Sequence, residues 1–324
     1  MCAAKRARRR TSSGRRRSRA TGRFLPAAVT GFRDSLLLGK ELFHEFLAFV
    51  DAESAATLCE AMAGSRSTLT LLFDRKHWRR LLQLHCNVAL TLDQEAVKVH
   101  RSIPVASGCD ELANYLSLRS QLASFSRNVA VVRGDLGSIS SVEGQPVDCL
   151  AFPTSSSYRN PRRGVAGCVH QRAGPDLDRT VENVGLRGRA TAGSVLSTMG
   201  CASGMRLLVH CVGPTGGLPD SEELLCKTYV NALLAADNNH VTCAAVASIS
   251  TGQLQFPIAS AADVALAAVR DLIRLHPHWA TKIAFVCLDE QVYAQFQRAR
   301  QETLRAFHTA GFAFPQVLSP DSSA

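Results

Sequence analysis

The sequence predicts an α/β protein: a three-layer α/β/α sandwich with a mixed, mostly parallel sheet, preceded by a small helical module. After residue 127, short apolar runs rich in Val, Ile, Phe, Cys and Ala alternate with helical patterns, an order typical of parallel strands joined by crossover helices. Before residue 127, apolar residues instead recur at the three-to-four spacing of amphipathic helices. With 324 residues, 46% of them apolar, the chain is long enough for two domains.

The positive charge is concentrated in residues 1–23. This segment holds ten Lys and Arg residues and no acid, which leaves 27 basic residues against 27 acidic ones in the rest of the chain. We expect a disordered basic tail, because such a segment has too few apolar residues to fold. Its two Arg-rich clusters suit a nuclear-import signal or a sequence-independent contact with nucleic-acid phosphates. We therefore expect a nuclear protein, with a mitochondrial or cytoplasmic location as the alternative, that meets nucleic acid only through its tail.

Composition excludes several other classes. No window approaches 18 uninterrupted apolar residues, so we expect no membrane partner. The eleven cysteines are scattered and never spaced as Cys-x-x-Cys, which argues against a disulfide framework and a zinc site. We expect most of them to be small buried apolar residues, and we expect no metal and no cofactor.

Residues 24–126 are predicted to form a helical module and linker. In LLLGKELFHEFLAFVDAESAATLCEAM the apolar residues Leu42, Phe46 and Leu47 share one helical face, and RKHWRRLLQLHC adds an amphipathic segment around Trp78. This pattern resembles the F-box, which implies a Skp-type adaptor of cullin-based ubiquitin ligases as a partner. The usual Leu-Pro is replaced by Leu38-Gly39. The alternative is a helical lid without that partner.

Residues 127–312 are predicted to form the α/β domain, and residues 313–324 a disordered C-terminal tail. The five predicted strands are NVAVVRGDL, VDCLAFPT, MRLLVHCVGP, TCAAVASIS and KIAFVCLD. The predicted helices are GVAGCVHQRA, SEELLCKTYVNALLAADN, SAADVALAAVRDLIRLH and DEQVYAQFQRARQETLRAF. In such a sheet we expect a ligand beyond the carboxyl ends of the strands, where loops meet helix N-termini.

Several motifs of this domain occur in the order of one known family. They are VVRGDL, GVAGCVHQRAGP, GRATAGSVLSTMG, LVHCVGP, ISTGQLQFP and FVCLDE. Over residues 127–305 the chain resembles the macrodomain family, which implies a binding site for ADP-ribose, free or attached to protein. The site residues implied by the resemblance are Asp135, Leu136, Ser155, Gly164, Val165, Ala166, Ser250, Thr251, Gly252, Gln253, Leu254 and Phe256.

The resemblance assigns roles to two of these segments. Asp135 would accept a hydrogen bond from the adenine amino group. The strand ending in Ser250-Thr251-Gly252 is expected to turn sharply at the glycine and direct backbone N–H groups at the diphosphate. Phe256, followed by a proline, would stiffen the exit of that turn.

The sequence also departs from the hydrolases of the family. Ser155 stands in place of their Asn and Ala166 in place of their acid, and Gly164 alone remains of their glycine run. Arginines fill the same loop, either as phosphate contacts or as a solvated surface; they are Arg159, Arg162 and Arg163. We assign no catalytic residue and favour binding, with hydrolysis of ADP-ribose from protein or nucleic acid as the alternative.

Aromatic residues that the family places around the ligand are also missing. Leu254 and Gln255 replace an aromatic residue and a glycine of the turn, and Leu288 follows the last strand, which leaves Tyr293 as a doubtful substitute over the adenine. On its own, His170 is interpreted as a packed helix residue.

Overall fold

The computed structural model describes residues 43, 46, 47, 49, 50, 52–63, 71–86, 109–183 and 190–318. The helices and strands named below belong to the compact unit His44–Ala324. The predicted basic tail, 1–23, and the last residues, 319–324, lie outside the described residues. No helix in the described part of the chain is both long enough and apolar enough to span a bilayer.

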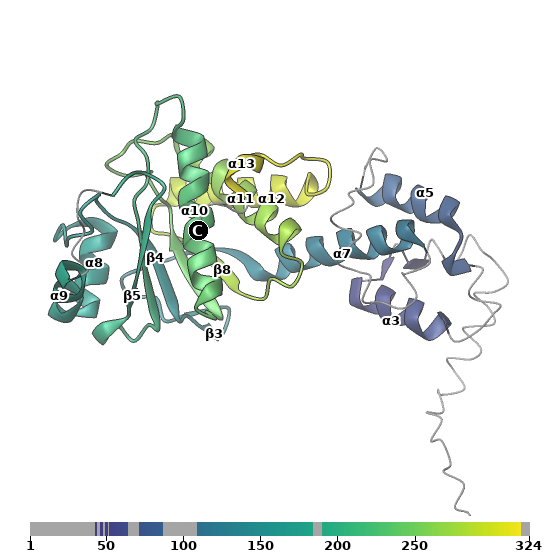
Figure 1. Cartoon of the computed structure of the whole chain (residues 1–324), viewed down its shortest axis with the longest axis horizontal. Helices are drawn as coiled ribbons and strands as arrows, with labels where there is room; N and C mark the ends of the chain where they lie inside the picture. Colours follow the sequence, from purple (N-terminus) through teal and green to yellow (C-terminus); the bar gives the residue numbers. More distant parts are fainter. Residues whose placement is uncertain are drawn as a thin grey trace, which may run out of the picture. The chain divides into compact units, whose positions relative to one another are not determined.

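The centre of the α/β domain is a six-stranded sheet in the order β1-β8-β7-β4-β6-β5 (Figure 1). The strands are β1 (Val129–Arg133), β4 (Cys149–Pro153), β5 (Val195–Met199), β6 (Leu207–Cys211), β7 (Cys243–Ala247) and β8 (Lys282–Cys287). All neighbours are parallel except β5, which pairs antiparallel with β6 at the edge. The predicted mixed, mostly parallel sheet is therefore confirmed, and all five predicted strands are present.

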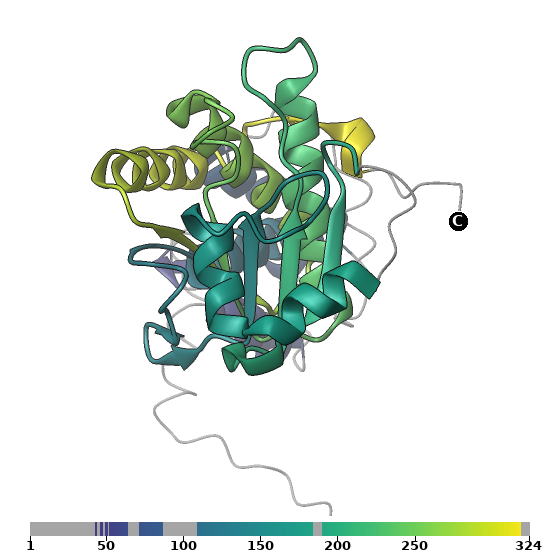
Figure 2. The same ribbon diagram turned by 90° about the vertical axis from the view of Figure 1, so that its left-hand side faces the viewer.

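Helices cover both faces of this sheet. One face carries α8 (Gly164–Ala173) and α9 (Pro175–Asn183), which lie in front of the strands in Figure 2. The other face carries α10 (Ser221–Asn238), α11 (Ile258–Leu275) and α12 (Glu290–Arg305). Apolar side chains from strands such as β7, all five residues of which are buried, fill two cores between the three layers.

The buried cysteines belong to these cores. Of the nine cysteines whose side chains the structure describes, Cys168 and Cys201 are exposed and the other seven are buried, and all nine are free thiols. Burial raises the pKa of Cys211 and of Cys287 to about 12, because a thiolate is poorly solvated there. These cysteines therefore act as small apolar residues, as predicted.

Five short elements were not predicted from the sequence. The short antiparallel pair β2 (Ser141–Val142) and β3 (Gln145–Pro146) follows β1. The segment after α8 forms the helix α9, and the segment before β6 contributes the edge strand β5. A three-residue helix, η3 (Cys201–Ser203), joins β5 to β6.

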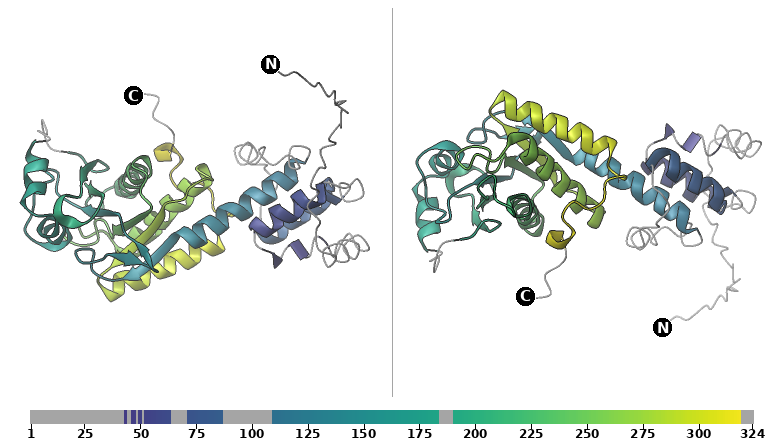
Figure 3. Two further views of the ribbon diagram at one scale, coloured as in Figure 1. Left: turned by 90° about the horizontal axis from the view of Figure 1, so that it is seen from below. Right: turned by 90° about the horizontal axis from the view of Figure 1, so that it is seen from above.

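The helix α7 (Asp110–Asn128) corrects the domain boundary that we predicted between residues 126 and 127. Its first half contacts the preceding helices: Tyr115 packs on Trp78 with ring centroids 5.5 Å apart. Its second half belongs to the α/β core, where Asn128 donates to the Trp279 carbonyl at 3.2 Å and Phe125 packs on Phe307. Figure 3 shows α7 entering the layer of α11 and α12. One helix is thus shared by both predicted domains.

The preceding helices are α3 (Ala52–Ala63) and α5 (Arg75–Cys86). They lie within two of the predicted helical segments, whereas the F-box-like module stays a prediction. Leu47, expected on a partner-binding face, is fully buried, and its carbonyl accepts the Tyr115 hydroxyl at 3.3 Å. Leu42 lies outside the described residues. Phe49 is 89% exposed.

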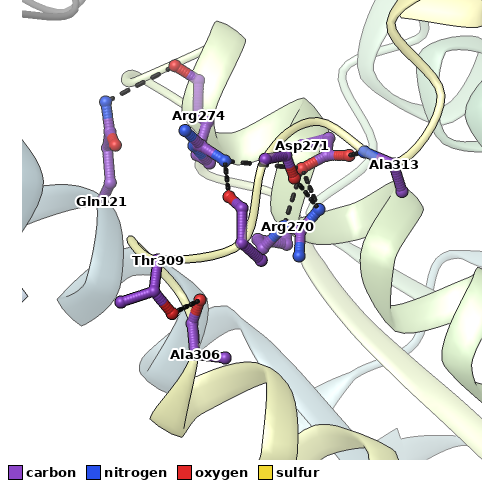
Figure 4. A network of polar contacts seen from close by, with 9 residues as sticks. Gln121, Arg270, Asp271, Arg274, Ala306, Thr309 and Ala313 are labelled. Atoms are coloured by element: carbon purple, nitrogen blue, oxygen red, sulfur yellow. Dashed lines mark hydrogen bonds and ion pairs between the residues drawn. The ribbon is translucent and has the colours of Figure 1, made fainter. Parts of the chain in front are cut away.

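The predicted C-terminal tail begins too early at residue 313. Residues 315–318 form the short helix α13 (Pro315–Leu318), and Val317 packs against the core. The preceding segment is tied to α11 by the buried Asp271 carboxylate, which accepts the Ala313 N–H at 2.9 Å and pairs with Arg270 at 2.7 Å (Figure 4). The Arg270 guanidinium also donates to the Gly311 carbonyl at 2.9 Å. Residues 313–318, which we predicted to be disordered, therefore pack on the α/β domain.

Candidate ligand-binding site

The candidate site lies along the carboxyl edge of the parallel strands. Because β1, β8, β7, β4 and β6 run in one direction, the loops that follow them meet at the same edge of the sheet. The predicted site residues fall in the loops after β1, β4 and β7 and in the first turn of α8. The topology therefore brings them to one side of the domain, as the sequence predicted.

The loop after β1 forms a tight turn around Asp135. The carboxylate Oδ1 accepts the Gly137 N–H at 2.9 Å, and the backbone carbonyl of Asp135 accepts the Ile139 N–H at 3.0 Å. Asp135 is exposed, while the next residue, Leu136, is buried in the core. The turn thus fixes one carboxylate oxygen and leaves the other, Oδ2, able to accept a hydrogen bond from a ligand.

The helix α8 holds this turn from behind. A Cβ at Gly137 would lie 2.8 Å from the Cβ of Cys168, so only glycine fits there. From the same helix, Arg172 donates to the carbonyls of Ile139 and Ser203, both at 2.8 Å. Neither residue was recognised from the sequence, because both act through a close approach of chain segments.

The loop after β4 leads into the exposed amino end of α8. Gly167 is the first residue of the helix whose N–H reaches a helical acceptor, the Arg163 carbonyl at 3.1 Å. The N–H groups of Gly164, Val165 and Ala166 precede it and have no acceptor within the helix. No acid stands in the first turn, so this end of α8 presents donors and positive potential. Gly164 has φ +63° and nothing within 4 Å of its Cβ position.

Ser155 and Ala166 offer little for catalysis. Ser155 is exposed, and its Oγ lies 3.0 Å from the Oγ of Ser157. Ala166 is buried against the core and has no ionisable group. Across the described residues, no group of three or more His, Cys, Asp or Glu side chains is arranged to hold a metal ion.

The loop after β7 corrects the predicted turn at Gly252. The left-handed backbone conformation falls on Ser250, with φ 67°, and on Gln255, with φ 49°, whereas Gly252 has no positive φ. Phe256 closes the loop: its side chain is buried, and its N–H donates to the Ser250 carbonyl at 3.0 Å. Gly252 is exposed, and a Cβ there would meet nothing within 4 Å. Gly252 therefore contributes by leaving the space beside this loop free of a side chain.

Backbone donors remain free in this loop. The Gln255 N–H donates to the Gly252 carbonyl at 3.0 Å, but no described residue accepts from the N–H groups of Thr251, Gly252 and Gln253. Leu254, half-buried, accepts the Gly216 N–H through its carbonyl at 3.0 Å. The loop therefore presents successive N–H groups, as predicted, although their geometry is set at Ser250.

The loop after β6 packs directly under this turn. A Cβ at Gly213 would lie 2.3 Å from the Oγ of Ser250, and one at Gly216 would lie 2.7 Å from the Cα of Phe256. The sequence signal was the LVHCVGP motif, but the need for glycine at these positions comes from contact with a distant segment. Beside Phe256 these loops and the first turns of α10 and α11 line an open pocket of about 390 Å³; its lining includes Leu218, Glu222 and Pro257.

Two hydroxyl groups at this edge are buried without a hydrogen-bond partner in the described structure. They are Oγ1 of Thr154, at the end of β4, and Oγ of Ser250, beyond the end of the neighbouring strand β7. Buried hydroxyls are normally paired, so these two groups are the polar atoms of the site most in need of a partner. Thr154 was not identified as a site residue from the sequence.

His170 is a packed helix residue, as interpreted. It is buried, and its Nδ1 lies 2.6 Å from the Asp178 carboxylate of α9. Its ring contacts that of His210 on β6, with centroids 5.7 Å apart. Burial, and secondarily the charge of His170, lower the pKa of His210 to about 3, so His210 is neutral at physiological pH.

The adenine end lacks an aromatic cover from β8. Leu288, 70% exposed, is the apolar side chain that follows this strand. Tyr293 packs against the core on the side of α10–α12, and its hydroxyl accepts a hydrogen bond from the Gln297 side chain at 3.1 Å. Leu288 is therefore the better-placed apolar contact for a ligand.

Comparison with known proteins identifies the family. The Macro domain family model matches residues 154–265. O-acetyl-ADP-ribose deacetylase of Escherichia fergusonii is 32% identical over 166 residues, covering 50% of this chain and 89% of that protein. A Macro domain-containing protein of Lactiplantibacillus plantarum is 31% identical over 173 residues, covering 53% of this chain and 95% of that protein.

A solved structure was also matched. The Oceanobacillus iheyensis macrodomain with ADP is 25% identical and covers 54% of this chain and 90% of that one, with a TM-score of 0.49. Because this chain spans most of the length of both sequence relatives at more than 30% identity, it belongs to the macrodomain family. The resemblance noted in the sequence is confirmed.

Proposed function

We propose that this chain binds ADP-ribose, as a reader of ADP-ribosylation or as a scaffold with weak affinity for the nucleotide. The observation that carries the proposal is that two sets of free backbone N–H groups lie at the carboxyl edge of one sheet. They belong to the first turn of α8 and to Thr251, Gly252 and Gln253. Such donors suit a diphosphate, and Asp135 at the same edge offers a carboxylate oxygen to an amino group.

The test is a calorimetric titration of the full chain with ADP-ribose. We expect a dissociation constant tighter than about 100 μM, which corresponds to more than about 5 kcal/mol. Inosine diphosphate ribose is the matched control, because it presents a carbonyl where adenine has an amino group and should bind more weakly beside the Asp135 carboxylate. Absence of measurable ADP-ribose binding by the folded protein would refute the proposal.

A second candidate is an ADP-ribosyl hydrolase or deacetylase, and the names of the bacterial relatives favour it. Against it, Ser155 and Ala166 supply at most one hydroxyl, whereas hydrolysis needs an oriented water and a fixed distal ribose. We expect little or no release of ADP-ribose from modified Glu, Asp or Ser, and little deacetylation of O-acetyl-ADP-ribose. Loss of positioning and base catalysis together slows turnover by a factor of about 10³ or more.

The activity test compares the unaltered chain with Ser155→Asn combined with Ala166→Asp. A trace of activity in the double variant alone would support the reading of these two positions. Robust release by the unaltered protein would contradict it, and activity that also needs Arg159, Arg162 or Arg163 would indicate a replacement mechanism based on the arginine loop.

We also propose that the helical module couples the α/β domain to a Skp-type adaptor. Phe49, 89% exposed, and Leu84 on α5, also exposed, support a contact with a partner. Affinity capture of the full chain from cells should recover adaptor and cullin, and Phe49→Asp should abolish this recovery because a charge would enter an apolar contact. Met199→Asp is the matched control, since Met199 is an exposed apolar residue of the α/β domain. If adaptor and cullin are not recovered, the module is better described as a lid.

A further inference from the structure

The loop between β4 and α8 carries a compact group of positive charges. Arg159, Arg162 and Arg163 are exposed, and none of them pairs with an acid among the described residues. Asp178 of α9, whose carboxylate accepts from the Asn160 side chain within this loop, also contacts His170. We call Arg159, Arg162 and Arg163 the arginine loop.

The backbone of the arginine loop is fixed from below. Tyr158, 2% exposed, anchors it with a ring that meets His210 edge-on at 6.2 Å. The Arg162 N–H donates to the Asn160 side chain at 2.8 Å, and a Cβ at Gly167 would lie 2.8 Å from the Arg162 carbonyl carbon. Tyr158 and Arg162 both have positive φ, of 57° and 55°, a conformation that non-glycine residues hold only when neighbours enforce it. The guanidinium groups therefore extend from a backbone of fixed conformation.

An anion is the natural partner of this loop. The three cations repel one another and stand at the positive end of α8, and among the described residues none of them forms an ion pair with an acid. Guanidinium groups pair in a two-pronged manner with carboxylates as well as with phosphates. The loop borders the edge of the sheet where the proposed diphosphate site lies, so its anion can also belong to whatever ADP-ribose is attached to.

The surroundings favour an acidic peptide over a nucleic-acid strand. Strand recognition uses a long basic groove and aromatic side chains that stack on bases. Beyond the first 23 residues the chain holds equal numbers of basic and acidic residues, and Tyr158, the aromatic residue of this loop, is buried. The positive charge of this loop is confined to residues 159–163, a length that suits a short run of carboxylates.

We propose that the arginine loop binds an acidic segment next to the modified residue of an ADP-ribosylated protein. This inference rests on the proposed binding of ADP-ribose and adds the class of protein that is read. The acidic segment adds affinity through charge-assisted hydrogen bonds, while the nucleotide occupies the edge of the sheet.

The experiment compares synthetic peptides that carry one ADP-ribose on serine, flanked on both sides either by Glu and Asp or by Gln and Asn. Their affinities for the full chain are measured at low and high salt, together with free ADP-ribose and a single-stranded DNA carrying ADP-ribose on its terminal phosphate. The test variant replaces Arg159, Arg162 and Arg163 with Gln. The control variant replaces the exposed residues Arg80, Arg127 and Arg305 with Gln, which removes the same charge elsewhere and retains the basic tail.

We expect the acidic peptide to bind at least tenfold more tightly than the neutral peptide at low salt, with a smaller ratio at high salt. The arginine-loop variant should lose this ratio, and the control variant should keep it; the ratio compares two peptides that carry the same nucleotide, so any change in affinity for ADP-ribose itself cancels. Equal affinity of the two peptides, or a ratio that survives in the arginine-loop variant, overturns the inference. Loop-dependent binding of the modified DNA that exceeds binding of the acidic peptide overturns it in favour of a strand end. Failure of free ADP-ribose to bind refutes the proposed function, and the inference with it.

Discussion

Replacing Gly252 with Glu is expected to weaken ADP-ribose binding about thirtyfold while the fold stays intact. The Cβ of the new side chain meets nothing within 4 Å, and the backbone at Gly252 is not left-handed, so the substitution introduces neither a clash nor strain. Its carboxylate enters the space in front of the N–H groups of Thr251 and Gln253, where the diphosphate is proposed to lie.

Electrostatic repulsion sets the size of the effect. At a separation of about 8 Å and an effective dielectric constant of about 40, each phosphate charge repels the carboxylate by about 1 kcal/mol. Two phosphates therefore cost about 2 kcal/mol, which is about thirtyfold in the dissociation constant. Gly252→Gln, of equal size and no charge, should lose only the smaller steric part of this affinity.

The assay is calorimetric titration with ADP-ribose, combined with thermal unfolding to verify the fold. Gly311→Glu is the control, because Gly311 is also open and exposed but contacts the carboxyl half of α11, at the opposite edge of the sheet. An unchanged affinity in folded Gly252→Glu protein would show that the ligand does not lie at this loop.

Three further outcomes are expected. Asp271→Ala leaves the buried Arg270 without its carboxylate and should lower the free energy of unfolding by about 3–5 kcal/mol, measured by urea titration; a loss below about 1 kcal/mol would contradict a buried ion pair. Burial, and secondarily the charge of Arg274, lower the pKa of His308 to about 4, so the unfolded chain binds more protons between pH 4 and pH 6.5. The contribution of His308 to the free energy of unfolding is then fully present above about pH 6.5 and is lost as the pH falls toward about 4. The variant His308→Leu should therefore show a weaker dependence of the free energy of unfolding on pH in urea titrations. The same pH dependence in both proteins would exclude His308 as a source. Deleting residues 1–23 should move the protein out of the nucleus without changing its melting temperature, as seen by microscopy and calorimetry, and persistent nuclear location would exclude the import role.

Local pattern was sufficient for the regular elements of the sandwich. The segment predicted as SEELLCKTYVNALLAADN is α10 (Ser221–Asn238), and five apolar runs became the five parallel strands. These segments bury one face or both, so the spacing of their apolar residues is enough to predict whether they form helices or strands. The edge strand β5 was missed because only one of its five residues is buried. The helix α9 is amphipathic, with Leu177 and Val181 buried on one face, but its nine residues give only a short pattern.

The order of the motifs determined the family and the edge of the sheet that carries the site. The backbone geometry within the site did not follow, because the turn expected at Gly252 is made at Ser250. Ser250 is held there by the direct approach of Gly213, which is 37 residues away in the printed sequence and adjacent only after β6 and β7 are placed in the sheet.

The sequence by itself thus determined which residue types meet at the carboxyl edge: small residues that allow close backbone approach, one acid, and arginines in place of glycines. Tertiary structure decided which N–H groups remain free, which oxygen of Asp135 is already used, and that α7 continues from the helical module into the α/β core. The physical reason is that composition and periodicity act over a few neighbouring residues, whereas a free donor or a left-handed residue depends on contacts between segments that are distant in the chain.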